Sequence, residues 1–475
     1  FMNIYIPTLV DIINASIEFL ISKDKFDELI NNIKEEINNF VNTLKSLDKN
    51  FDIMKKIYNI LYKLYGLSAL SLKNPDYLSD IIFSQAALSI LLSAAFYEHI
   101  RIRHSDLQPI MSYIHSNRNN SIEGLKEALK KLLNIDYKGV VEVTYEILNA
   151  LPQDPAINLR IRDLIKLSID IVSNQGILKR DFAGRIYHEI AGGIAYRKGY
   201  ATFYTSIPAA YLLASLATKV LFNLDLNNVT KLSNEKVNEV ISKARNIRIA
   251  DFACGSGTLL TASFNAIDRL LRILKFYYDI NINIDEIEKV IIEEGIYGID
   301  ALRYAAQIAA INLSLMAPSN ILKTNTYTIY LGVIPNKGPW LGSLELLRDS
   351  GRVGGILSYI ENSTKDIIER TTIEGSEGAF TVPTSFDLVI MNPPFTRPTG
   401  RRSKQYEEEG TSKGLFGFIT DEKTRKILHK RLDNFREEIR NNLINIAEEV
   451  ESSLSQDLQV ILTNKEDFGS YLNIG

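Results

Sequence analysis

One stretch near the middle of the chain constrains the fold more than any other. Apolar residues alternate up to Asp251, a run of small residues containing Gly255 and Gly257 follows, and an apolar segment of helical character begins at Thr258. This order predicts a strand, a tight turn and a helix. Glycines let the backbone approach a ligand, and a helix start presents free N–H groups, so the pattern indicates a nucleotide-type site. A tight turn without a ligand gives the same pattern and stays an alternative.

A second apolar stretch, residues 386–391, ends on an amide, two prolines and an aromatic residue, which are Asn392, Pro393, Pro394 and Phe395. If both stretches are strands of one parallel sheet, their loops meet at the carboxyl edge, where open α/β sheets bind ligands. The two motifs together resemble those of the amino-group methyltransferases that use S-adenosylmethionine, most closely the N6-adenine DNA methyltransferases. Residues 251–258 are similar to the cofactor loop of that family, and residues 392–395 are similar to its catalytic loop.

The resemblance implies an α/β fold with a Rossmann-like methyltransferase sheet and S-adenosylmethionine as the cofactor. It implies that the Asp251 carboxylate orients the cofactor through its amino-acid portion. The rest of the loop would let the backbone approach, through Ala253, Cys254, Gly255, Gly257 and Thr258. We interpret Cys254 as a small packed residue rather than a nucleophile, because methyl transfer to an amine needs no covalent intermediate.

Two further positions bear on the cofactor site. Asp300 closes a short apolar strand and is followed by Ala301. An acid at the end of the second strand of a nucleotide-binding unit can accept both ribose hydroxyls, although Asp300 as a helix N-cap is the alternative. Ser343 follows Gly342 where the family usually carries an acid near the adenine ring, so adenine recognition is the weakest part of the match.

Thr205 lies upstream, in a segment that resembles the aromatic-Tyr-Thr-Pro motif of the family. That motif lies against the methionine end of the cofactor, and its position before the cofactor loop gives the gamma order of motifs. Here Ser206 follows the threonine and the proline comes at Pro208, which departs from the family pattern. Hydroxyls before a first-turn proline are also typical of a helix start, so capping alone is an alternative role for Thr205.

The family's catalytic loop suggests a chemistry of alignment. An aromatic amine is a poor nucleophile because its lone pair is delocalised into the ring. In this resemblance the Asn392 side-chain oxygen and the Pro393 carbonyl accept the hydrogens of the amine, and no general base is required. Pro393 and Pro394 restrict the backbone and hold that carbonyl still. Phe395 would stack on a base that has been flipped out of the duplex.

A basic loop follows at once and contains Arg397, Arg401, Arg402 and Lys404. Beside the target pocket, these residues are candidates for contacts to the phosphates of double-stranded DNA, whereas a solvated charge run is the alternative. The whole chain has a net charge of −3, so contact with DNA has to come from such a local patch. Because the chain has only five histidines and one cysteine, we expect no metal-centred site. A single cysteine also excludes a disulfide framework, and we therefore expect a cytoplasmic protein.

The 475 residues predict more than one domain. We expect a helical N-terminal domain over 1–198, a Rossmann-like catalytic domain over 199–395, and a basic loop with a helical insertion over 396–475. The helical domain would serve as a scaffold or, alternatively, clamp DNA. Its apolar run, residues 81–97, is interrupted by serines and Gln85, which favours a buried helix and no membrane span. Residues 351–380 are expected to form a surface loop with one helix.

A complete methyltransferase sheet needs three further strands after the catalytic loop, and the sequence that follows offers only residues 458–462 as a weak strand candidate, so the sheet is expected to be incomplete at its C-terminal side. The hypothesis is an N6-adenine DNA methyltransferase of a restriction-modification or related defence system, working with a specificity or nuclease subunit. One alternative is an RNA or protein amide methyltransferase, because those enzymes share the Asn-Pro-Pro-aromatic loop. The other is a non-methylating nucleic-acid-binding subunit that keeps the fold, which the weak match at Ser343 favours.

Overall fold

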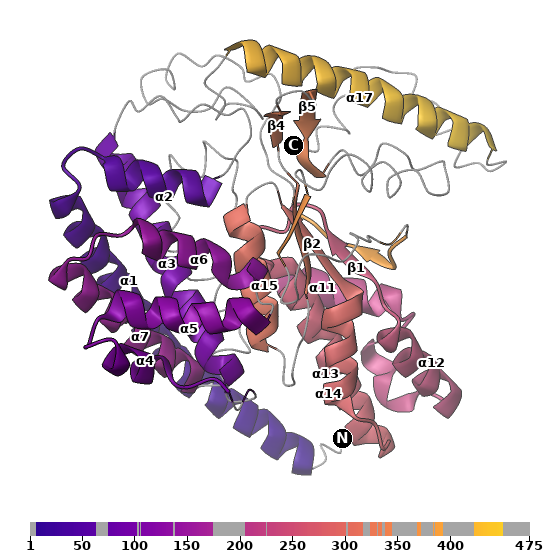
Figure 1. Ribbon diagram of the computed structural model, residues 1–475. Helices are drawn as coiled ribbons and strands as arrows, with labels where there is room; N and C mark the ends of the chain where they lie inside the picture. Colours follow the sequence, from indigo (N-terminus) through magenta and orange to yellow (C-terminus); the bar gives the residue numbers. More distant parts are fainter. Residues whose placement is uncertain are drawn as a thin grey trace.

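The computed structural model describes residues 6–62, 75–101, 104, 106–135, 138–173, 205–224, 226–300, 303–316, 324–329, 331–334, 338–343, 368–371, 383, 385–392 and 422–449. The first part is helical, with α1 (Ile6–Leu47), α2 (Asp52–Tyr62), α3 (Pro75–Arg101), α4 (Ile110–Ser116), α5 (Ser121–Ile135), α6 (Lys138–Ala150) and α7 (Pro155–Ser173). Figure 1 shows these helices packed together on one side of the molecule. The predicted helical region is therefore confirmed for its described part.

An apolar stripe explains why α1 packs as it does. Residues at steps of three and four, including Ile33, Ile37 and Phe40, are at most 1% exposed, which places one face of the helix in the core. Leu47, the last residue of the helix, continues this spacing but is 42% exposed. The Asp48 carboxylate lies before α2 and caps its first turn, because it accepts from the backbone N–H groups of Ile53 and Met54 at 3.0 and 2.8 Å.

Helix α3 lies in the middle of this helical region. Its segment Ser79–Arg101 is long and apolar enough to cross a membrane, with a mean hydropathy of 1.5, yet 83% of that window is buried inside the protein. Its polar side chains bond to neighbouring helices. The hydroxyls of Ser93 and Thr144 lie 2.7 Å apart, and Thr144 donates to the Ser89 carbonyl at 3.0 Å, which joins α3 to α6.

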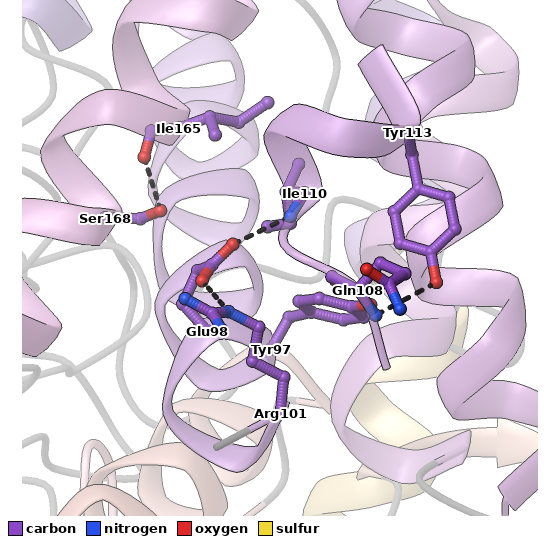
Figure 2. Close-up of polar contacts among 8 residues, drawn as sticks. All are labelled: Tyr97, Glu98, Arg101, Gln108, Ile110, Tyr113, Ile165 and Ser168. Carbon is purple, nitrogen blue, oxygen red and sulfur yellow. Dashed lines mark hydrogen bonds and ion pairs between the residues drawn. The ribbon is translucent and has the colours of Figure 1, made fainter. Parts of the chain in front are cut away.

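A buried polar cluster fastens the end of α3 to α4 (Figure 2). Glu98 is 2% exposed; it accepts from the Ile110 N–H at 2.8 Å and pairs with Arg101. The Tyr97 hydroxyl donates to the Gln108 carbonyl at 2.7 Å, and burial raises the pKa of that tyrosine. These contacts give the buried carboxylate the partners that it needs, so they stabilise the connection between the two helices.

The second part of the chain contains a sheet, whose described strands have the order β6-β3-β2-β1-β7. The strands β1 (Ile249–Asp251), β2 (Ile296–Asp300), β3 (Asn325–Ile329) and β7 (Leu388–Val389) are parallel, and β6 (Ile368–Thr371) is antiparallel to β3. A separate hairpin pairs β4 (Leu331–Ile334) with β5 (Gly338–Leu341). The α/β character that the two motifs predict is thus present in the described residues.

Helices connect and flank these strands. They are α11 (Ile207–Leu221), α12 (Asn234–Arg245), α13 (Thr258–Tyr278), α14 (Ile284–Val290) and α15 (Arg303–Met316), with short 3-10 and π turns at Leu226–Lys231 and Ile291–Gly295. In Figure 1, α15 lies between the helical region and the sheet. Its Gln307 side chain donates to the Val140 carbonyl of α6, and one apolar core runs from α1 through α3 and α6 to α13 and α15. The sheet is therefore anchored directly on the helical region.

Several elements differ from the sequence predictions. The strand expected over residues 386–391 is limited to Leu388–Val389. The span expected to be a loop with one helix contains strand β6 at Ile368–Thr371, because the other edge of β3 provides a free partner. The helical insertion expected within 396–475 is present as α17 (Glu422–Glu449), and its Leu428, Leu432 and Phe435 are buried.

Candidate functional site

The turn after β1 is held by backbone and carboxylate contacts. Asp251 ends the strand with 1% of its surface exposed, and its Oδ1 accepts from the Ala253 N–H at 3.0 Å. The Cys254 N–H donates to the Ile299 carbonyl of β2 at 2.9 Å, and the Gly255 N–H donates to Oδ2 of Asp300 at 2.9 Å. The carboxylates of Asp251 and Asp300, which end β1 and β2, thus both accept hydrogen bonds from the backbone of one turn. This turn extends from the end of β1 to the end of β2.

Both glycines of this turn have backbone conformations that other residues rarely adopt. Gly255 has φ +53°, and a Cβ added there would have no atom within 4 Å, so this face of the turn is open. Gly257 has φ +84° and forms the N-cap of α13. A Cβ on Gly257 would lie 3.1 Å from the Ala309 side chain of α15, so the turn packs closely against that helix. The sequence pattern of strand, turn and helix has this form in the structure.

The electrostatics of the turn favour neutral side chains. The pKa of the Asp251 carboxyl is raised from 3.8 to about 8; burial is the largest cause, the hydrogen bond from the Ala253 N–H lowers the pKa, and the nearby Asp300 raises it. Burial and the same two carboxylates raise the pKa of the Cys254 thiol well above its usual range. A neutral thiol is a poor nucleophile. Gly298 leaves room for this side chain, since a Cβ there would lie 3.2 Å from Cys254 Sγ.

The second motif follows β7, which is the direct neighbour of β1. Ala250 pairs with Val389 in parallel register, and the Ile390 N–H donates to the Ala250 carbonyl at 2.9 Å. Because the two strands are parallel neighbours, Asp251 and Asn392 follow them at the same edge of the sheet. The sheet topology therefore brings Asp251 and Asn392, which are far apart in the sequence, to one edge of the sheet.

Thr205 comes to the same place from the other direction. It precedes α11, and its Oγ1 accepts from Nδ2 of Asn392 at 3.0 Å, across 187 positions of the sequence. The N-cap of α11 is Ser206, which makes no side-chain capping bond. A capping role for Thr205 thus has no support in the contacts of this helix, whereas a role beside Asn392 does.

The other predicted site residues fall into two groups. Ser343 is described, but it follows β5 of the separate hairpin rather than a strand of the larger sheet. The remaining ones lie outside the described residues, namely Ala301, Pro393, Pro394, Phe395, Arg397, Arg401, Arg402 and Lys404. Across the part of the chain that is described, no group of three or more His, Cys, Asp or Glu side chains could hold a metal ion.

Two asparagines outside the predicted set of site residues also shape the site. Asn312 of α15 is buried and donates to the Ser256 carbonyl of the glycine turn at 3.4 Å. Asn265 of α13 donates to the Tyr211 hydroxyl of α11 at 2.7 Å, which fixes the helix that follows Thr205. Asn265 is a polar residue within a helical pattern, so only the three-dimensional arrangement distinguishes it from a surface residue.

Comparison with known proteins adds no family to this picture. No family model matches the chain, and no curated protein matches it either. The interpretation of the site therefore rests on its own residues, on the sheet topology that groups them, and on the resemblance of the two motifs.

Proposed function

We propose that this chain is an S-adenosylmethionine-dependent methyltransferase that modifies the N6 amino group of adenine in double-stranded DNA. The observation that carries the proposal is the juxtaposition of a glycine turn between two carboxylates with Asn392, the first residue of the Asn-Pro-Pro-Phe sequence, which follows the neighbouring parallel strand. In open α/β sheets, ligands bind at this carboxyl edge. The sheet would then be part of a Rossmann-like methyltransferase fold.

The charge of the turn supports a cationic ligand. Asp251 is buried, and within the described part of the chain the groups that affect its pKa are a backbone N–H and a second carboxylate, Asp300, and not a cation. A ligand with a positive group would supply the charge partner that an ionised Asp251 lacks. S-adenosylmethionine carries an ammonium group and a sulfonium group, and when bound it supplies the methyl group for transfer.

The turn also supports the rest of such a ligand. The open face at Gly255 allows the backbone to approach, with the flanking small residues Ala253, Cys254 and Thr258. Asp300 at the end of β2 would accept the ribose hydroxyls, as acids at this position of nucleotide-binding units do. The contacts to the adenine ring belong to residues other than these, and Ser343 is the candidate from the resemblance.

The residues after β7 would activate the acceptor. The Asn392 Oδ1 atom and the Pro393 carbonyl would accept the hydrogens of the amine and localise its lone pair on nitrogen. Alignment of two reacting groups in this way can contribute about 7–11 kcal/mol at its limit. Phe395 would stack on the flipped base, and Arg397, Arg401, Arg402 and Lys404 would contact the flanking phosphates. A specificity or nuclease subunit would be the protein partner, in the cytoplasm.

Transfer of a labelled methyl group tests the proposal. The chain is incubated with labelled S-adenosylmethionine and duplex DNA, and the label is traced to the modified base. We expect label on adenine N6 with the natural protein and none with Asn392→Ala. Label on RNA or on a protein amide would favour the wider Asn-Pro-Pro-aromatic enzymes, and DNA binding without any transfer would favour a non-methylating subunit. Either result would refute the proposed reaction.

A further inference from the structure

The hydrogen bond between Thr205 and Asn392 has a direction, and that direction matters for the reaction. The amide nitrogen of Asn392 is the donor and the threonine hydroxyl oxygen is the acceptor, at 3.0 Å. We propose that Thr205 is a positioning residue: its hydroxyl holds the amide by Nδ2, so that Oδ1 is left to accept from the target amine. This inference rests on the proposed function and assigns the hydroxyl a task other than cofactor contact.

An asparagine amide has two ends of nearly equal size and opposite character. Its oxygen only accepts hydrogen bonds, and its NH2 group only donates them. A target amine presents N–H bonds, so it is bound by the oxygen and opposed by the NH2 group. A rotation of the Asn392 side chain by half a turn would therefore replace attraction with repulsion. A fixed partner at Nδ2 removes this ambiguity before the substrate arrives.

The elements around Thr205 are suited to hold a hydroxyl still. Pro208 lies in the first turn of α11, and the Ala210 N–H donates to the Ser206 carbonyl at 2.8 Å, so the helix begins immediately after Thr205. Tyr211, one turn further on, accepts from Asn265 of α13 at 2.7 Å. Since α13 itself begins at Gly257, the helix after Thr205 is fastened to the helix that starts at the glycine turn.

Asn392 follows the strand that pairs with β1. It lies two positions beyond Ile390, whose N–H bonds to the Ala250 carbonyl of β1. Thr205 and Asn392 are both partly buried, so water competes less for their hydrogen bond than at an exposed place. The Thr205 hydroxyl thus precedes a helix that is bonded to α13, and the Asn392 amide follows a strand that is bonded to β1. Both α13 and β1 adjoin the glycine turn.

A kinetic comparison of three variants tests the inference. Thr205→Val keeps the branched shape and removes the hydroxyl, and Thr205→Ser keeps the hydroxyl. The control Ser215→Ala removes a hydroxyl of α11 that donates to the Tyr211 carbonyl. At saturating cofactor and DNA we expect kcat to fall about tenfold in Thr205→Val, the effect of one well-placed hydrogen bond. Thr205→Ser should restore most of that rate, and Ser215→Ala should not change it.

Binding of S-adenosylmethionine, measured by calorimetry on the same variants, separates the two roles of the hydroxyl. A positioning role predicts a Kd for the cofactor that stays within about twofold of the natural protein in Thr205→Val. A weaker cofactor affinity with an unchanged kcat would assign Thr205 to the cofactor and overturn the inference. An unchanged kcat and an unchanged Kd would overturn it as well.

Unfolding temperatures test the contact independently of any activity. If Thr205 and Asn392 are bonded, the loss in Tm of the double variant is smaller than the sum of the losses in Thr205→Val and Asn392→Ala. The reason is that the bond between the two residues can be lost only once. Additive losses would refute the contact itself. A natural protein that transfers no methyl group would refute the proposed function, whereas an active protein that is insensitive to Thr205→Val refutes only the positioning role.

Discussion

The buried carboxyl group of Asp251 allows a prediction that needs no substrate. Its surface is 1% exposed, and burial raises its pKa to about 8 in the folded protein. In the unfolded chain the same group titrates near its usual value of about 3.9. Between these two values the folded state keeps a proton that the unfolded state has released. The folded protein therefore becomes less stable as the pH rises through this range.

The change Asp251→Asn removes this titration and keeps an acceptor oxygen for the Ala253 N–H. A difference in bound protons of one changes the free energy of unfolding by about 1.4 kcal/mol per pH unit. From pH 5 to pH 7 the free energy of unfolding of the variant should therefore rise by about 3 kcal/mol relative to that of the natural protein. The stability that the protonated Asp251 contributes is fully present in the natural protein below about pH 4, and it is lost as the pH rises through about 8.

Urea unfolding at a series of pH values measures this difference. The midpoints of the natural protein and of Asp251→Asn should diverge steadily from pH 5 to pH 8, with the variant the more stable at the higher values. Asp285→Asn removes a carboxylate from an exposed place in the first turn of α14 and controls for the loss of charge. Parallel curves for Asp251→Asn and the natural protein would show that the carboxyl is not held in its neutral form.

The same variant separates stability from function. If Asp251 binds the positive group of the cofactor, Asp251→Asn should abolish detectable binding of S-adenosylmethionine while making the free protein more stable at neutral pH. Greater stability together with lost binding is expected where a binding site keeps a residue that destabilises the free protein. A more stable variant that binds the cofactor with undiminished affinity would remove Asp251 from the binding site and leave the pKa shift as a purely structural feature.

Two further predictions concern the turn and the basic loop. Gly257→Ala should lower the free energy of unfolding, measured in urea, by about 1–3 kcal/mol, because φ is +84° and the added Cβ would lie 3.1 Å from Ala309. Gly255→Ala should lower it by less, because φ is positive there but the space for a Cβ is open. An equal cost would mean that contact with α15 is unimportant. The double change Arg401→Glu with Arg402→Glu should weaken DNA binding and flatten its dependence on salt concentration, whereas Lys130→Glu should not; an unaltered slope would leave the loop as a solvated charge run.

The elements that the sequence predicts well are those whose pattern is local. The stripe through Ile33, Ile37 and Phe40 repeats with helical spacing, and the strand before Asp251 is followed by the turn residues that end it. Strand β3 escapes such an analysis because all five of its residues, Asn325–Ile329, are buried, polar ones included. Strand β6 contains adjacent charged residues, Glu369 and Arg370, and only its pairing with β3 gives it a strand conformation.

The grouping of the site depends partly on local motifs and partly on long-range contacts. The topology rule for parallel strands was enough to expect the ends of β1 and β7 at one edge, and their pairing gives that arrangement. The contact of Thr205 with Asn392 spans 187 positions and has no local signature. The capping alternative for Thr205 was equally consistent with the sequence, because a hydroxyl before Pro208 suits both roles.

The position of α15 explains why a large helical region accompanies this turn. Gly257 packs on Ala309, and Asn312 donates to the Ser256 carbonyl, so α15 supports the turn at two points. The same helix is bonded to α6 through Gln307 and lies in the core that α3 shares. A turn with two positive φ values depends on its surroundings to stay in place. Part of that support reaches the turn through α15 from the helical region, which therefore contributes to the geometry of the candidate site without containing any of its predicted residues.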